Sequence, residues 1–445
     1  MERITAIYLA CMFSVFLLFP GLGGYAQITA HKWILFLILS AAYILIALIL
    51  RVQLALIGDQ PLPSPRQLAK SLSAVQICVI AFWFFSVLST LFSIDPALSF
   101  WGGSRRDGLL TITLYCAVFL LVSRCAALKG WFLILFGVAI SLNCLVALMQ
   151  FAGWNPFSLY PQGMNYYDAG IRYAGEFLGT IGNVDLLSAV LCLAIPAFWI
   201  GIWKIRDKRR LLLLIPLALS LAVLLTAFVA GGVVGILGSA LLAIPVLAKK
   251  KRTRVILALA LVLVLILGLF FVYAFGGRMG GFLYEASELL HGRWDDKFGS
   301  GRLYIWRNVW QLLPDRLLLG GGPDTLVLRT DAAFERYDES LGMLLRSVID
   351  NAHNEYLNVL INQGLPALLC WLAALFCAAA QWIRSAPHHA GVAMCGGAVL
   401  GYCIQAFFGL SSPISTPFFW LALALLHAGV SAKHEFKSTE GGRKP

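Results

Sequence analysis

The chain has 445 residues, of which 60% are hydrophobic and only 13% are charged. Soluble globular domains carry about a quarter charged residues, so a water-soluble fold would leave too little polar surface to cover such a core. The same figures exclude a disordered chain, because disorder requires low hydrophobicity and high charge. The formal net charge of +12 fits either nucleic-acid binding or, far more often in so apolar a chain, cytoplasmic anchoring of a membrane protein.

Apolar stretches in chain order predict an all-α polytopic membrane protein with about twelve transmembrane helices, since a spanning helix needs about 20 apolar residues. The stretches fall at residues 4–20, 33–50, 72–92, 109–122, 131–151, 184–203, 211–228, 231–247, 255–275, 355–380, 391–408 and 416–430. The seventh and eighth are separated at Ala230-Gly231-Gly232, because glycine adopts turn dihedrals cheaply. The first lacks a small-residue cleavage site, which favours a retained helix over a signal peptide.

Basic residues predict the orientation of these helices. With the N-terminus inside, the cytoplasmic segments hold 21 of the 34 basic residues. The short outer loops hold only Lys32, Arg105, Arg106 and Arg172. Cytoplasmic loops are enriched in Lys and Arg, so we predict that both termini are cytoplasmic.

The loop 276–354 is the most polar part of the chain. Together with the residue that follows, it holds 9 basic and 12 acidic residues, too many for a plain connector. We predict a small, partly helical extracytoplasmic subdomain here. The predicted organisation is transmembrane helices 1–9 at 1–275, the extracytoplasmic loop at 276–354, transmembrane helices 10–12 at 355–430 and a cytoplasmic tail at 431–445.

A short helix in this loop carries the first candidate residue. The run Gly299-Ser300-Gly301 suits a turn into a helix beginning at Arg302, with Trp306 and Trp310 one turn apart on one face. Such a helix is either an aromatic anchor at the membrane interface or the carrier of an arginine that faces a phosphate. The nearby run 320–324 forms either an anion-binding nest or, more often, a plain turn.

A second candidate lies where the loop enters the tenth span. Asn354, Asn358 and Asn362 recur every four residues and form a polar stripe, which serves either interhelical hydrogen bonds or a wet cavity. His353 stands at the mouth of this stripe. It is either a structural residue at a helix start or a base that takes a proton from a hydroxyl group. No residues have metal-ligand spacing, so we predict no metal site.

These motifs resemble those of the O-antigen ligase/polymerase superfamily. The resemblance rests on Arg…Ile-Trp-Arg…Pro…Gly-Gly-Gly at 302–322 and on Ala-His-Asn-Glu-Tyr-Leu at 352–357 followed by Gly364. It also rests on Gly…Arg…Gly-Leu at 101–110 and Gly-Asn at 179–183. The motifs follow one another in order and cover most of the chain.

The resemblance implies a mostly α-helical membrane glycosyltransferase with no metal, cofactor or nucleotide sugar. Members take a glycan from a polyprenyl-diphosphate carrier, such as undecaprenyl diphosphate, and pass it to an acceptor at the outer face of the cytoplasmic membrane. The acceptor is a hydroxyl or amide of a lipid, protein or glycan, as in lipopolysaccharide and other cell-envelope polysaccharides. Direct displacement by one base would invert the anomeric configuration. The implied partners are this donor, the acceptor and membrane lipids, without nucleic acid.

The resemblance also implies roles for individual residues. His353 matches the catalytic histidine, and Arg302 matches the loop arginine thought to engage the diphosphate. The family commonly has Ser-Arg-Gly at the outer turn of a helix hairpin, whereas residues 228–232 here read Phe-Val-Ala-Gly-Gly. Either another arginine supplies this charge or this member is divergent or inactive. The further predicted residues binding the diphosphate or glycan are Arg105, Arg106, Arg172, Asn183, Asn354 and Asn358.

Three alternatives stay open at this stage. A polymerase of the same superfamily uses the same donor chemistry and differs in its acceptor, which composition does not reveal; we favour a ligase. A lipid or polysaccharide transporter or flippase usually shows paired repeats and broken helices at the midplane, and this chain has no convincing repeat. A non-enzymatic assembly partner is the third alternative.

Overall fold

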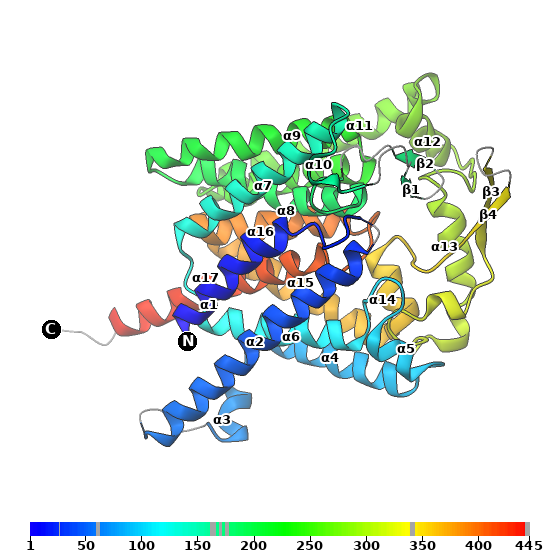
Figure 1. Cartoon of the computed structure of the whole chain (residues 1–445). Helices are drawn as coiled ribbons and strands as arrows, with labels where there is room; N and C mark the ends of the chain where they lie inside the picture. Colours follow the sequence, from blue (N-terminus) through cyan, green and yellow to red (C-terminus); the bar gives the residue numbers. More distant parts are fainter. Residues whose placement is uncertain are drawn as a thin grey trace.

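The computed structural model describes residues 1–25, 27–58, 63–160, 166–168, 171–173, 178–338 and 343–440. Within these ranges the protein is a bundle of long helices lying side by side (Figure 1). Both β-hairpins and the helices α5, α12, α13 and α14 gather at one end of the bundle, on the right of Figure 1. The two chain termini lie toward the other end.

Helices occupy all twelve ranges predicted to span the membrane. They are α1 (Glu2–Cys11) continued by the π-helix η1 (Met12–Phe16), α2 (Ile28–Leu56), α4 (Ala74–Leu91), α6 (Leu109–Cys125), α7 (Gly130–Phe151), α8 (Val184–Lys204), α9 (Leu214–Ala227), α10 (Ala230–Leu247), α11 (Lys251–Phe275), α14 (Glu355–Gln363) with α15 (Leu365–Ser385), α16 (Ala390–Gln405) and α17 (Thr416–Glu440). Eight helices in the described part are long and apolar enough to cross a membrane. Three further apolar helices are shorter, so the all-α membrane class is confirmed and the count of twelve stays a prediction.

Shorter elements connect these helices. They are α3 (Pro65–Lys70), α5 (Pro96–Trp101), η2 (Pro156–Ser158), η3 (Lys208–Leu213), η4 (Gly276–Arg278), α12 (Gly281–Leu290), α13 (Arg302–Gln311), η5 (Pro314–Arg316), η6 (Leu326–Leu328) and the antiparallel hairpins β1 (Tyr166–Asp168) with β2 (Ile171–Tyr173) and β3 (Ala333–Asp338) with β4 (Met343–Val348). The loop 276–354 therefore combines short helices with one hairpin. Its position outside the cytoplasm stays a prediction.

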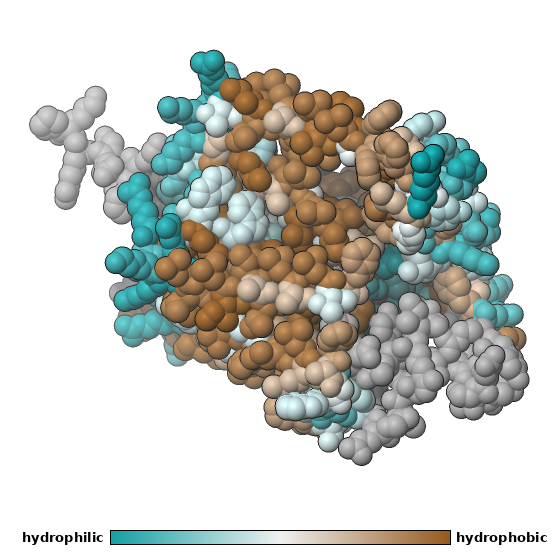
Figure 2. Space-filling view, turned by 90° about the horizontal axis from the view of Figure 1, so that it is seen from above, coloured by the Kyte–Doolittle hydropathy of each residue, from teal (hydrophilic) through white to brown (hydrophobic). Residues whose placement is uncertain are grey.

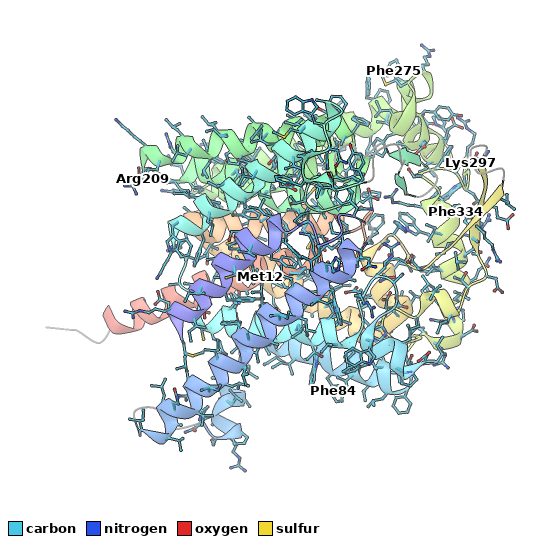
Figure 3. All side chains as sticks on the ribbon, viewed as in Figure 1. Met12, Phe84, Arg209, Phe275, Lys297 and Phe334 are labelled. Carbon is cyan, nitrogen blue, oxygen red and sulfur yellow. The ribbon has the colours of Figure 1, made fainter. Side chains whose placement is uncertain are left out.

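The surface of the bundle is divided into an apolar belt and two polar ends. Figure 2 shows hydrophobic side chains across the middle of one face and hydrophilic ones at both ends. Helix α11 packs against α10 but has no fully buried residue, so most of its apolar side chains are exposed. Arg209 and Lys297 mark the opposite ends of the molecule in Figure 3. This arrangement fits a bundle surrounded by lipid.

The predicted tenth span is interrupted, which corrects its boundary. Helix α14 ends at Gly364, whose φ of +87° favours glycine, and Pro366 follows in the first turn of α15. A Cβ atom at Gly364 would lie 2.1 Å from the carbonyl oxygen of Leu318, so the loop packs directly against the break. The candidate span begins at Leu365 rather than at residue 355, and α14 lies with the short elements at the hairpin end (Figure 1).

The centre of the bundle is helix α8, which is buried along most of its length. It contacts α9, α10 and α16. Close packing with α16 depends on small side chains, because a Cβ atom at Gly401 would lie 2.2 Å from the carbonyl oxygen of Cys192. Since α8 is held so firmly, the groups at its N-terminus have fixed positions at the hairpin end.

Candidate active site

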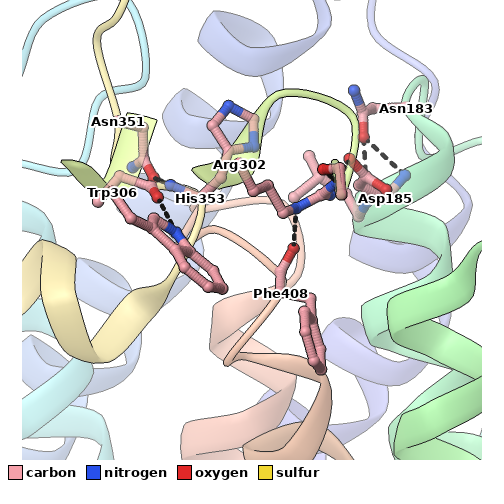
Figure 4. Close-up of polar contacts among 10 residues, drawn as sticks. Asn183, Asp185, Arg302, Trp306, Asn351, His353 and Phe408 are labelled. Atoms are coloured by element: carbon pink, nitrogen blue, oxygen red, sulfur yellow. Dashed lines mark hydrogen bonds and ion pairs between the residues drawn. The ribbon is translucent and has the colours of Figure 1, made fainter. Parts of the chain in front are cut away.

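The loops at the hairpin end bring the two main candidate residues together. Arg302 begins α13, and His353 lies in the loop that precedes α14. Figure 4 shows the imidazole ring of His353 beside the side chain of Arg302. The charge of Arg302 is one of the factors that lower the pKa of His353, which agrees with this proximity.

The guanidinium group of Arg302 is held by three other segments of the chain (Figure 4). Its Nε donates a hydrogen bond to the carbonyl of Phe408 at 2.9 Å, and Nη1 donates to the carbonyl of Gly299 at 2.8 Å. Its Nη2 lies 3.4 Å from the Asp185 carboxylate in the first turn of α8. The side chain is 17% exposed, so the cation has a defined position and remains accessible at the surface.

The backbone at His353 is unusual, and hydrogen bonds hold it at His353 itself and at the preceding residue. Its φ of +47° lies in the left-handed region, which few residues other than glycine adopt. Its amide donates to Oδ1 of Asn351 at 2.9 Å. At the preceding residue, Trp306 donates to the Ala352 carbonyl at 3.0 Å, and the Ala352 amide donates to Asn358 Oδ1 at 3.3 Å. Strained backbone held by its surroundings is frequent at functional sites.

The imidazole of His353 is uncharged at neutral pH. Burial and the nearby cations of Arg105 and Arg302 lower its pKa to about 3, against the opposing effect of Asp350. A neutral imidazole keeps one ring nitrogen as a hydrogen-bond acceptor. It can therefore accept a hydrogen bond from an incoming hydroxyl group.

A second arginine joins the same region from the turn after α5. Arg105 forms a two-point contact with Asp350, with Nε and Nη2 at 2.9 and 2.8 Å from the two carboxylate oxygens. Ser104 also donates to this carboxylate at 3.1 Å. Burial opposes ionisation of Asp350, but the charge and hydrogen bonds of Arg105 outweigh it and lower the pKa below its usual value. The pair ties the turn after α5 to the histidine loop.

Two further carboxyl groups, those of Asp324 and Asp107, lie in the same region as this ion pair. Oδ2 of Asp324 accepts hydrogen bonds from the amides of Gly103 at 2.6 Å and Asp107 at 3.4 Å. Burial, followed by the proximity of Asp107, raises the pKa of Asp324 to about 7. Burial likewise raises the pKa of Asp107 to about 6. These acids fix the turn that presents Arg105.

The pKa of Asp324 predicts a stability that falls as the pH rises. The folded state binds more protons than the unfolded state between the ordinary value of 3.8 and about 7. Ionising this carboxyl group should therefore lower the free energy of unfolding by an amount on the order of 4 kcal/mol. The full loss is reached once the pH exceeds the pKa of the folded state. We expect the thermal midpoint in detergent to be several degrees lower near pH 8 than near pH 5.

The matched variant for this prediction is Asp324→Asn, which keeps an acceptor for the amide of Gly103. It should remove only part of the pH dependence, because burial also raises the pKa of Asp107 to about 6 and that of Glu355 to about 8, and both add slopes of the same sign. The lowered pKa of His353 adds a slope of the opposite sign below its ordinary value. The lowered pKa of Asp350 acts only below its ordinary value, outside this pH window. An unchanged slope in Asp324→Asn would show that other groups cause the effect.

The glycine run before Asp324 is a plain turn and not an anion nest. The amides of Gly321 and Gly322 donate to the carbonyls of Ile361 and Asn362 at 3.1 and 2.8 Å. These donors are therefore satisfied by the end of α14 and do not converge on a ligand position. The turn instead places Asp324 against the backbone of the turn that carries Arg105.

The predicted asparagine stripe has two roles. Asn354 caps α14 by accepting from the Leu357 amide at 3.0 Å, and Asn362 donates to Asn358 at 3.2 Å. Asn358 also lines a small, mostly apolar cavity of about 40 Å³, to which Asp107 and Glu355 contribute polar groups. The Glu355 carboxylate accepts a hydrogen bond of 2.6 Å from Tyr402. The hydrogen bonds of Asn354 and Asn362 lie within α14 and not between helices, and the walls of the cavity are mostly apolar, so both readings of the stripe stay predictions.

The remaining predicted residues lie in different places. Asn183 caps α8 by accepting from the amides of Asp185 and Leu186 at 2.9 and 3.0 Å, close to Arg302 in Figure 4. Arg106 lies over the ring of Trp33 at 5.3 Å. The side chain of Arg172, in strand β2, is outside the described residues. In the described part of the chain no three potential metal ligands form a cluster.

Several residues of the site were not predicted from the sequence. Asp350 is the partner of Arg105, and Asp185 and the carbonyl of Phe408 are partners of Arg302. An acid in the first turn of a helix is usually explained by the helix dipole, so Asp185 gave no distinct signal. Asp350 adjoins the histidine motif, and this position beside predicted site residues was the available clue.

The turn at residues 228–232 between α9 and α10, where the family that the sequence resembles commonly has an arginine, borders this site. The chain turns between α9 and α10, where a Cβ atom at Gly231 would lie 2.9 Å from Cβ of Phe408. Phe408 is the residue whose carbonyl holds Arg302. A charged side chain at this turn would therefore lie close to Arg302.

Comparison with known protein families gives a match. A family model described as O-antigen ligase matches residues 215–372. This range runs from α9 into α15 and contains both Arg302 and His353, whereas Arg105 and Asn183 precede it. The chain has no match among curated proteins.

Proposed function

We propose that the protein is a membrane glycosyltransferase of the ligase type in the O-antigen ligase/polymerase superfamily, because a family model described as O-antigen ligase matches residues 215–372. In this proposal it takes a glycan from a polyprenyl-diphosphate carrier and transfers it to an acceptor hydroxyl or amide, without a metal or nucleotide sugar. The active site faces outward from the cytoplasmic membrane, and both termini are cytoplasmic. The observation that carries the proposal is the pairing of His353 with Arg302 at one end of the bundle.

The chemistry requires a proton acceptor and stabilisation of a leaving diphosphate. The acceptor oxygen attacks the anomeric carbon, and the bond from that carbon to the phosphate oxygen breaks. His353 accepts the proton of the acceptor, while Arg302 faces the negative charge that develops on the diphosphate. Attack from the side opposite the leaving group inverts the anomeric configuration.

Substrate binding would adjust His353 for this role. Two of the factors that lower its pKa are the cations of Arg105 and Arg302. A diphosphate bound between them would offset both charges, so the pKa of His353 would rise toward the range in which a general base works. The histidine would then become a better base only when the donor is in place.

The site also suggests which residues replace the missing hairpin arginine. Arg105 approaches the histidine loop from the turn after α5 and exchanges Asp350 for phosphate oxygens when the donor binds. Asn183, Asn354 and Asn358 mainly orient the backbone of the site, and Arg106 supports the same turn. Arg105 is thus the second cation of the proposed diphosphate site.

The proposal is tested by transfer in a reconstituted membrane. The purified chain, in liposomes with a polyprenyl-diphosphate-linked glycan, should release polyprenyl diphosphate and glycosylate a supplied acceptor. A lipid acceptor that receives one glycan block indicates a ligase, whereas elongation of the donor glycan itself indicates a polymerase. Movement of intact donor across the bilayer without bond cleavage would support the transporter alternative and contradict the proposed function.

A further inference from the structure

An apolar cavity lies in the bundle away from the candidate active site. Its volume is about 470 Å³, and it lies among η1, α7, α8, α16 and α17. Aromatic and aliphatic side chains form its walls, among them Phe13, Phe136, Leu193, Phe418 and Leu425. The space is partly open to the surroundings of the bundle, so a ligand can enter it.

The shape of the cavity suits an extended apolar chain. It follows α17 from Gly429 to Phe418, a helical length of roughly 16 Å. Ala398 and Ala422 line it with small side chains, which leaves room along the axis. Apolar cavities stay dry and accept apolar ligands. An acyl chain is the apolar group that a membrane offers at this length.

Basic side chains lie at or near one end of the cavity, called its mouth below. Lys129 and His389 line it directly, and Lys129 is 39% exposed while paired with Glu2 at 2.7 Å. Lys204 donates at 3.2 Å to the carbonyl of Pro387, two residues before His389. Arg210 donates at 3.0 Å to the carbonyl of Ile205, which also lines the cavity. Such a rim favours an anionic headgroup over a neutral one.

The mouth lies at the end of the bundle opposite to the site of Arg302 and His353. Arg209, near the mouth in sequence, and Lys297, in the long loop, lie at opposite ends in Figure 3. A ligand anchored at Lys129 would therefore not present its headgroup to the candidate active site. The cavity is a separate site from the one proposed for the glycan carrier.

We propose that this cavity binds one acyl chain of an anionic glycerophospholipid, with the phosphate among Lys129, Lys204 and His389. The bound lipid fills the space between α7, α16 and α17 and stabilises their packing. The inference does not depend on the proposed transferase activity, because its readout is bound lipid and not turnover.

The experiment counts bound lipid by native mass spectrometry of the full chain in mild detergent, with added phosphatidylglycerol. We expect one phosphatidylglycerol per chain, and about a tenfold weaker binding in Ala422→Phe, which fills the cavity. The matched control is Leu263→Phe in α11, a position that is 57% exposed on the outside of the bundle. If Ala422→Phe fails to fold, Ala197→Leu fills the same cavity from α8.

Competing lipids test the identity of the occupant. Phosphatidylcholine should bind more weakly than phosphatidylglycerol, and Lys129→Gln should reduce that difference. Equal binding of phosphatidylglycerol in the wild type and both filled variants would overturn the proposal. Equal retention of the two lipids, or preferential retention of a polyprenyl phosphate or of detergent alone, would overturn the proposed occupant.

Discussion

Replacing His353 by asparagine or alanine should lower the rate of glycan transfer by at least about 100-fold while the protein folds as before. Asparagine is the sharper choice, because it tolerates the left-handed conformation that His353 adopts at φ +47°. The variant therefore keeps the backbone of the loop and removes only the imidazole. Transfer is measured in liposomes from the release of polyprenyl diphosphate.

The control for this variant is His388→Asn, which changes an exposed histidine between α15 and α16. It should transfer at the wild-type rate. Unchanged thermal midpoints in both variants would show that folding is intact. Full activity in His353→Asn would exclude the histidine as the base and leave only a structural role.

The pH dependence gives an independent check on this role. In the free protein, burial and two cations lower the pKa of His353 to about 3, so kcat/KM should show no titration of this group near neutral pH. Donor binding offsets the cations and raises the pKa, so kcat should fall on the acid side, where the base is protonated. An acid limb in kcat/KM near the ordinary histidine value would contradict this account.

The sequence predicted best those structural features that depend on a local pattern of residues. Apolar runs located the helices of the bundle, because spanning helices need long uninterrupted stretches of this kind. The break between α14 and α15 lay inside one such run and was missed. Hydropathy does not reveal that Gly364 packs against Leu318, so the predicted span began about ten residues too early.

The candidate site was only partly predictable for a related reason. Arg302 and His353 stood out by motif, and the structure places them side by side. Their partners come from distant segments: Asp185 lies 117 residues from Arg302, and Asp350 lies 245 residues from Arg105. Such pairings depend on how the helices pack, and no periodicity in a single sequence encodes them. Arg105, grouped with Arg106 in the sequence, is separated from it by the structure, since one binds Asp350 and the other covers Trp33.

Arg302→Ala should reduce transfer by about 100- to 1000-fold, the usual cost of removing one group that stabilises a developing negative charge. Arg302→Lys should restore little, since a lysine cannot reproduce the forked contacts to Phe408, Gly299 and a phosphate.

The matched control lies on the same helix. Arg307 is 59% exposed and pairs with Asp296, so Arg307→Ala removes a cation from α13 without disturbing the site. It should leave transfer within about twofold of wild type, because exposed ion pairs contribute little.

Equal losses in the two variants would indicate that α13 contributes general positive charge. A selective loss in Arg302→Ala together with a rise in the donor KM would mean that the guanidinium binds the ground state. A selective loss in kcat would mean that it acts on the leaving diphosphate, as the proposed mechanism requires.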